Sequence, residues 1–391
     1  MKKLVVVFLI IALFGCNKTV DRPEVEASIP VLRITTTNKT PVTSKTTYQD
    51  ASLVIEGDLP YTGDGEIRGR GNTTWTFPKK PFKIKFSDNT SLLNGLPAKE
   101  WVLLANYLDP SLMHNAVAMK IGKLLSIPFT NTIKPVDLWL NNEYLGSYTL
   151  TEQVEAKENR VEVGEDGVLL SLDTIIDSDD AFFASSTYKL PVIIKYPKEN
   201  NDPRFRIIEN EFNELEKRIA ATDFPNNNYL DFFDADAMAN YLIVYTLTCN
   251  EEINHPKSTY IHKKPGGKFT MGPIWDFDWA FSYEQNRVHY VNPQRPLFWQ
   301  GNSKGTTFFE RIANDPKIKA LVKTKWLNFR ENDFAELIAF VDRYANQIET
   351  SRAADFKKWQ RGESDFNIEK ADLRNWLELR ARYMDELVST Y

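Results

Sequence analysis

The segment "GPIWDFDWAF" holds two carboxylates, Asp276 and Asp278, separated by one residue and flanked by Trp275 and Trp279. In an extended backbone, residues two apart point to the same side, so we expect both acids on one face and the aromatic residues on the other. Two anions held this close repel each other and lose hydration unless a cation lies between them. The pair therefore predicts a site for a divalent metal ion.

A second stretch, "EIRGRGNTTWTFPKKPFKIKF" at residues 66–86, combines glycines, arginines and lysines. A Gly- and Arg-rich turn between strands, followed by lysines, suits phosphate oxygens, because backbone amides form a concave anion site and cations neutralise the ligand. Taken alone, this pattern favours a solvated basic hairpin. Together with the acidic segment, it supplies the parts for binding a metal-bridged triphosphate.

The elements that must position these segments begin with a β-rich half. Val-, Ile- and Thr-rich stretches from residue 31 onward predict strands. One amphipathic helix interrupts them, starting at Asp109 and Pro110 and ending before Pro128. Asn141 and Asn142 predict the turn of a hairpin between two alternating strands.

The second half is helical and carries the acidic segment on a late hairpin. Helical periodicity follows Pro203, a second helix is capped by Asp234 or Asp236, and helices continue beyond residue 305. The acids come after a hairpin whose turn is "PGG". This segregation predicts an α+β protein with a β-rich N-terminal lobe at residues 30–200, a helix-rich C-terminal lobe at 201–391, and a cleft between them.

Composition and spacing argue against several other classes of function. The formal net charge of -5 gives no cationic field, so we expect no nucleic-acid partner. The four histidines show no zinc-ligand spacing, and a G-x-S-x-G nucleophile elbow is absent. Two acids spaced i, i+2 on one strand would lie on the same side of a sugar, whereas a glycosidase needs carboxylates that flank the bond.

The N-terminal sequence, "MKKLVVVFLIIALFGC", has a basic start and an apolar run from Leu4 to Phe14. The run is too short to span a bilayer as a helix, so residues 1–15 predict an export signal. "LFGC" resembles a bacterial lipobox, which makes Cys16 the predicted lipidation site and residues 16–29 a tether. We therefore expect a membrane-anchored lipoprotein of the bacterial cell envelope, periplasmic or at the cell surface. Only Cys249 then remains, so no disulfide framework is available.

Five motifs, in this order, resemble the CotH (spore coat protein H) kinase-like family: "IRGRGNTTW", "KKPFKIKF", "WVLLANYLDPSLMHNAVA", "LGSYTLTEQVE" and "GPIWDFDWAF". The resemblance covers roughly residues 30–345, and the ordered set is more specific than any one motif. It implies a two-lobed, atypical protein-kinase-like fold over residues 30–391. It also implies binding of ATP with Mg²⁺ or Mn²⁺ and phosphorylation of a protein partner.

The resemblance also assigns roles to residues of this sequence. Asp276 and Asp278 are the implied metal-binding acids, and Lys85, with Lys80 as second choice, is the implied contact to the α/β-phosphates. The implied phosphate-covering turn contains Arg68, Arg70 and Asn72. Glu152 is implied to be a partner of the lysine or a residue near the adenine pocket, and an exposed strand end is an equal alternative.

The stretch "CNEEINHPKSTYIHKK" departs from the family's pattern of an Asn-x-Asp element followed by an Asn. Asn250 is present, but Glu252 occupies the position of the catalytic base, and Lys257 and Ser258 stand where an amide is expected. The extra methylene of Glu moves the carboxylate by about an ångström, which costs rate. Two readings stay open: an atypical kinase that phosphorylates Ser or Thr of a surface or envelope protein, and a kinase-like scaffold that binds protein or glycan without turnover.

Overall fold

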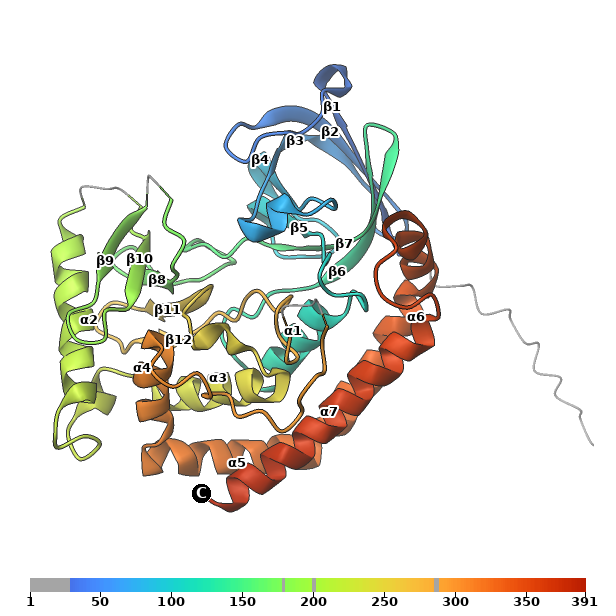
Figure 1. Ribbon diagram of the computed structural model, residues 1–391. Helices are drawn as coiled ribbons and strands as arrows, with labels where there is room; N and C mark the ends of the chain where they lie inside the picture. The colour runs from blue at the N-terminus through green and yellow to red at the C-terminus, as the bar shows by residue number, and fades with distance from the viewer. Residues whose placement is uncertain (1–28, 178–179, 199–201, 285–287) are drawn as a thin grey trace, which may run out of the picture.

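The computed structural model describes residues 29–177, 180–198, 202–284 and 288–391. A closed β-barrel lies above a larger body made of helices and a second sheet (Figure 1). Strands dominate the N-terminal part and helices the C-terminal part, which confirms the predicted α+β class. The predicted export signal and Cys16 lie outside the described residues, as does all of the tether except its last residue.

The barrel has the strand order β1-β2-β3-β4-β5-β7-β6, closed by parallel pairing of β1 with β6. Its strands are β1 (Val31–Thr36), β2 (Gln49–Glu56), β3 (Tyr61–Gly69), β4 (Phe82–Thr90), β5 (Ala98–Leu104), β6 (Lys134–Leu140) and β7 (Glu143–Glu152). Alternation fills its interior: on β4, Phe82, Ile84 and Phe86 are buried inside. The intervening Lys83 and Lys85 therefore point to the outer face.

The helix predicted near Asp109 is α1 (His114–Leu124), inserted between β5 and β6. The Asp109 carboxylate accepts hydrogen bonds from the backbone N–H groups of Ser111 (2.9 Å) and His114 (2.7 Å), which satisfies amide groups at the helix start. Helix α1 packs against α3 (Ala235–Thr248) and α6 (Phe334–Trp359), so the barrel sequence sends one helix into the other body.

The second sheet has the order β12-β11-β8-β10-β9 and joins distant parts of the chain. Its strands are β8 (Val168–Leu172), β9 (Ala181–Ala184), β10 (Pro191–Tyr196), β11 (Thr259–Lys263) and β12 (Thr270–Met271). β8 pairs with β11, so residues 168–196 belong with the later half of the chain and the barrel ends at β7. The predicted lobe boundary at residue 200 therefore does not coincide with the division between the barrel and the second sheet.

The remaining helices are α2 (Arg204–Ala220), α4 (Lys304–Ala313), α5 (Pro316–Asn332) and α7 (Phe366–Ser389). Helix α3 packs against α5 and α7 and is capped by Asp234, whose carboxylate accepts from the Ala237 N–H at 3.0 Å. In the part of the chain described here, no helix is both long and apolar enough to cross a membrane.

Helix α6 holds the barrel in place through a buried ion pair. The Lys79 ammonium lies 2.5 Å from Asp355 Oδ2, and the same oxygen accepts the Ser147 N–H at 2.8 Å. Gly146 has φ of +112°, and a Cβ there would come within 2.4 Å of Asp355 Oδ2. Only glycine fits at this crossing, so the contact between α6 and β7 is close packing of backbone against side chain.

Candidate functional site

A narrow polar cavity of about 200 Å³ lies between the barrel and the second sheet. The barrel contributes the loop after β3, from Arg70 to Thr74, and the segment after β5, from Leu104 to Leu108. The opposite wall comes from the second sheet and from the segments that precede β11 and follow β12: Ser171, Asp173, Ile193, Lys195, Glu252, Lys257, Ser258, Tyr260, Trp275, Asp276, Asp278 and Trp279.

Both predicted metal-binding acids face this cavity, but not by the geometry we expected. Asp276 has φ of +63°, a left-handed conformation, and the segment after β12 is not a strand. The prediction of extended backbone with aromatics on the opposite face is therefore wrong. Trp275 and Trp279 line the cavity beside the acids, and only Phe277 is completely buried. A left-handed Asp is a strained backbone position of the kind that clusters at functional sites.

Two asparagines fix the acidic segment from behind. Asn115, on the first turn of α1, donates from Nδ2 to Asp278 Oδ1 at 2.5 Å and accepts the Phe277 N–H at 3.0 Å. Asn250 donates to the backbone carbonyl of Asp276 at 3.3 Å. The sequence analysis missed Asn115, although a polar residue on the apolar face of an amphipathic helix is the signal that could have identified it.

The buried acids disfavour their own charged forms. Burial, and next the neighbouring charge of Asp276, raises the pKa of Asp278 to about 8. Burial also raises the pKa of Asp276, although the Arg70 guanidinium opposes the shift. Burial and the charge of Asp276 raise the pKa of Glu252 well above its ordinary value. A bound cation would relieve this repulsion.

Glu252, the predicted base, reaches the same cavity from a short 3-10 turn, Glu251–Ile253. Its backbone N–H donates to Asn250 Oδ1 at 3.1 Å, while its side-chain Oε2 is buried and has no hydrogen-bond partner. Asp173, at the end of β8, accepts the Ser258 N–H at 3.1 Å, and Ser258 Oγ lies 3.4 Å from Asp276 Oδ2. Asp173 and the exposed Asp177 are further acids of the cavity lining that were not predicted from the sequence.

Two cations flank the acids, and each lies over one of the tryptophans. The Arg70 guanidinium is 5.6 Å from the ring centre of Trp275, and the Lys257 ammonium is 4.8 Å from the ring centre of Trp279. The negative face of each indole attracts the cation and restricts its position. Burial lowers the pKa of Arg70, and the charge of Asp276 is the largest effect that opposes this shift.

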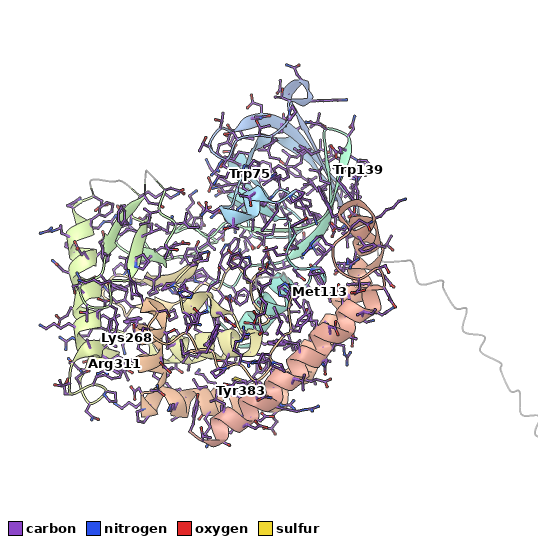
Figure 2. The ribbon with its side chains drawn as sticks, viewed as in Figure 1. Trp75, Met113, Trp139, Lys268, Arg311 and Tyr383 are labelled. Carbon is purple, nitrogen blue, oxygen red and sulfur yellow. The ribbon has the colours of Figure 1, made fainter. Side chains whose placement is uncertain are left out.

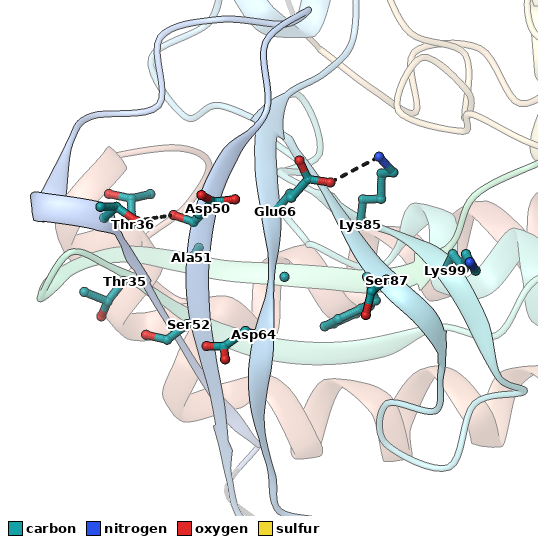
Figure 3. A pocket seen from close by; sticks show the side chains of 13 residues that line it. Thr35, Thr36, Asp50, Ala51, Ser52, Asp64, Glu66, Lys85, Ser87 and Lys99 are labelled. Carbon is teal, nitrogen blue, oxygen red and sulfur yellow. Dashed lines mark hydrogen bonds and ion pairs between the residues drawn. The ribbon is translucent and has the colours of Figure 1, made fainter.

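The structure does not bring every predicted phosphate contact to this cavity. Arg70 and Asn72 line it, but Lys85 lies in a separate open pocket of about 820 Å³ on the barrel surface, where it pairs with Glu66 at 3.1 Å (Figure 3). Lys80 donates to the carbonyl of Trp75 at 2.6 Å, and Trp75 lies at the lower end of the barrel (Figure 2). Both lysines therefore make local contacts. The sequence could not show this for Lys85, because alternation on β4 does not tell which row of its outer face borders the cavity.

Arg68 and Glu152 also lie outside the cavity lining. Arg68 lies over the Tyr48 ring at 4.9 Å and donates to the carbonyl of Gly69 at 3.1 Å. Glu152 is buried and accepts the Thr132 N–H at 2.8 Å, so the reading of an exposed strand end is wrong.

Lys83, which was not predicted as a site residue, lies nearer the cavity on β4 than the predicted Lys85 does. Lys83 forms an ion pair with Glu100 on β5 at 2.7 Å, with only 13% of its side chain exposed. Burial lowers the pKa of Lys83, and the charge of Glu100 opposes that shift. The Arg70 N–H donates to the Pro81 carbonyl, and Pro81 lines the cavity. Lys83 follows Pro81 by two residues, which is roughly 7 Å along an extended chain at 3.3 Å per residue, so it lies just beyond the cavity lining.

The cavity fits a divalent ion that takes part of its shell from a ligand. Its carboxylates are hard oxygen donors, and the unpartnered Glu252 oxygen shows unused binding capacity. Among the described residues, no three acidic, histidine or cysteine side chains converge into a complete ligand set. Mg²⁺ usually binds one or two carboxylates together with phosphate oxygens and water, so an incomplete protein shell agrees with a nucleotide-dependent metal site.

Comparison with known protein families identifies the family of this chain. The family described as CotH kinase protein matches residues 67–384, well over half of the chain. The matched region begins inside β3 and ends inside α7, and it contains every residue of the cavity. No curated protein matches the chain.

Proposed function

The chain belongs to the CotH kinase protein family, and on that premise we propose that it binds ATP with Mg²⁺ or Mn²⁺ in the cavity and phosphorylates Ser or Thr of a surface or envelope protein. The main support for this proposal is that Asp276 and Asp278 line the same cavity as Arg70 and Asn72, which come from the other side of the cleft. Phosphoryl transfer requires positioned cations and metal-binding acids around a polyphosphate, and this cavity contains both sets of side chains.

A two-lobed, kinase-like fold is part of this proposal. A β-rich body above a mainly helical one, with polar groups of both charges in the cleft, supports it. The Lys83–Glu100 pair on the outer barrel face supports it further, because protein kinases need a lysine–glutamate pair beside the phosphates. The cavity is smaller than pockets that enclose a drug-sized ligand, so a nucleotide bound here would stay partly exposed.

In this proposal each residue has one task. Asp276 and Asp278 hold the metal ion, which supplies charge neutralisation at the phosphates, and Asn115 and Asn250 keep the acidic segment in place. Arg70 and Asn72 contact phosphate oxygens. Glu252 accepts the proton of the substrate hydroxyl, and its raised pKa suits a group that must take up a proton.

A kinase-like scaffold without turnover is the second candidate function. One feature favours it: Lys257 and Ser258 replace the amide expected after the base, so a kinase-like metal shell is incomplete on that side. A scaffold of this kind would bind protein or glycan at the cell surface and would need no phosphoryl transfer.

Thermal unfolding of the full chain, purified in detergent, separates these functions. Millimolar ATP with Mn²⁺ should raise the melting temperature of the wild-type protein, since ligand at 100 times its dissociation constant stabilises by about 3 kcal/mol. Asp276→Ala should lose this shift, and Asp177→Ala, an exposed acid at the cavity mouth, should keep it. Absence of a shift in the wild-type protein would leave only the scaffold.

Labelled ATP then tests turnover. Phosphate transfer to an envelope protein fraction that is lost in Glu252→Gln would assign the base. Nucleotide binding without transfer in the wild-type protein would favour the scaffold.

The location is a separate proposal that rests on the sequence of the first sixteen residues. We propose that Cys16 carries the lipid and holds the protein at an envelope membrane. Labelled fatty acid should enter the wild-type protein and not Cys16→Ser, and the variant should leave the membrane fraction. Equal labelling of both proteins would contradict this assignment.

A further inference from the structure

Lys257 is a cavity cation to which the proposed function assigns no task and which has no acidic partner in the part of the chain that the structure describes. Its ammonium lies over Trp279, yet no carboxylate among the described residues lies within ion-pair distance of it. The neighbouring cavity lysine differs, because Lys195 pairs with Asp180 at 2.8 Å. Lys257 is thus a charged group held in the cavity by an indole and not by an acid.

The charge of Lys257 nevertheless acts on one side of the cavity, where the Lys257 N–H donates to the Glu252 carbonyl at 3.3 Å and the N–H of the adjacent Ser258 donates to Asp173 Oδ2 at 3.1 Å. It lowers the pKa of Glu252, of Asp173 and, as a lesser contribution, of Asp276. For Asp173 it is the largest contribution from any charged group. Glu252 and Asp173 therefore share Lys257 as a permanent counter-ion, whereas the cation that acts most strongly on Asp276 and Asp278 is Arg70, which comes from the barrel loop.

The possible metal ligands separate into the same two groups, Asp276 with Asp278 and Glu252 with Asp173. No three acids converge among the described residues, so the four carboxylates do not form a single multidentate site. Asp276 and Asp278 sit on one short segment braced by Asn115, and they suit one ion that completes its shell with phosphate and water. A second divalent ion on the Glu252 side would have to approach the Lys257 ammonium, and two cations so close repel each other.

We propose that Lys257 is the built-in counter-ion of the Glu252 and Asp173 side, so that nucleotide binding recruits one divalent ion, at Asp276 and Asp278, and not two. This inference rests on the proposed function and defines its metal requirement. Trp279 is the positioning residue, since it keeps the ammonium in the cavity and away from direct ion pairing.

The stoichiometry of bound Mn²⁺ tests this inference without any catalytic readout. The full chain in detergent is titrated with Mn²⁺ in the presence of a non-hydrolysable ATP analogue, and free Mn²⁺ is measured by electron paramagnetic resonance. We expect one bound Mn²⁺ per nucleotide in the wild-type protein and two in Lys257→Asn, which removes the cation and adds an oxygen ligand. Lys195→Asn, the matched change in the same cavity, should keep one.

A second measurement concerns the ligand-free protein. Lys257→Asn should melt at a lower temperature than the wild type, because two half-buried acids lose their counter-ion, and Mn²⁺ alone should raise the melting temperature of the variant back toward that of the wild type. Lys195→Asn should show no restoration by Mn²⁺.

The outcomes distinguish this inference from the function on which it rests. Two Mn²⁺ per nucleotide in the wild-type protein, or one in Lys257→Asn, overturns the inference and leaves nucleotide binding intact. Failure of the wild-type protein to bind either Mn²⁺ or the nucleotide overturns both. One ion in the wild type and two in the variant supports both.

Discussion

Asp278→Asn should stabilise the ligand-free protein while it abolishes the proposed metal binding. Asp278 is only 7% exposed, and its pKa is raised to about 8 by burial and by the charge of Asp276. Asparagine has the same shape, carries no charge and keeps an oxygen that can accept the hydrogen bond from Asn115. The change therefore removes the free-energy cost of burying an ionisable carboxyl without opening a cavity.

The magnitude follows from the difference between the folded and unfolded pKa values. Below pH 3.8 the carboxyl is protonated in both states and its ionisation has no effect on stability. As the pH rises from 3.8 to about 8, the unfolded chain loses this proton and the folded protein keeps it, so stability falls. Each pH unit contributes about 1.4 kcal/mol, so the cost at pH 7 is of order 4 kcal/mol.

Chemical denaturation at several pH values measures this effect. The unfolding free energy of Asp278→Asn should exceed that of the wild type by up to about 4 kcal/mol at pH 7 and by only about 0.6 kcal/mol at pH 4. Asp177→Asn, the same chemical change at an exposed acid of the cavity mouth, should differ little from the wild type at either pH. Added Mn²⁺ and ATP should stabilise the wild type and leave Asp278→Asn unchanged.

A variant that is no more stable than the wild type at pH 7 would contradict this prediction. So would a gain in stability that is the same at pH 4 and pH 7, because an effect of ionisation must shrink as the pH approaches 3.8. In either case burial would not be opposing the charge of this carboxylate, and the need for a cation in the cavity would lose its physical basis.

Three further predictions concern groups around the site. Lys83→Met should weaken the stabilisation by ATP and Mn²⁺ at least tenfold in apparent affinity, whereas Lys85→Met, one row further from the cavity, should leave a ligand titration unchanged. Asp355→Leu should cost about 3–5 kcal/mol in unfolding free energy, because it leaves the Lys79 ammonium buried and unpaired, and adding Lys79→Met should recover most of that loss in a denaturant titration. Burial lowers the pKa of His262, so below pH 6.5 the unfolded chain binds a proton that the folded protein does not. On acidification the unfolding free energy of the wild type should therefore fall by up to about 1.4 kcal/mol per pH unit relative to that of His262→Gln. Equal pH profiles of the two proteins would contradict this prediction.

Local patterns predicted most of the elements. The Asn141 and Asn142 pair joins β6 to β7 with positive φ at both positions, as a two-residue hairpin turn requires. The strand alternation, α1, and the "PGG" turn between β11 and β12 were all readable, because each depends on residues close together in the chain. The family was identified from ordered motifs and is now shown by the match over residues 67–384.

Contacts between distant residues decided the rest. Alternation places Lys83 and Lys85 on the same outer face of β4, and only the register of β4 with β3 and β5 shows that Lys83 lies nearer the cavity. The pairing of β8 with β11 across some ninety residues brings Asp173 to the acids. Neither fact is encoded in a local pattern.

The elements, the family and the presence of the acidic pair could therefore be predicted from local patterns, since backbone periodicity and turn chemistry act over a few residues. The cations that meet those acids follow only from the folded arrangement. The left-handed Asp276, the bond from Asn115 and the tryptophan-held Lys257 all depend on packing between segments far apart in the chain. Burial sets the charge state of each acid there, and burial exists only in the folded molecule.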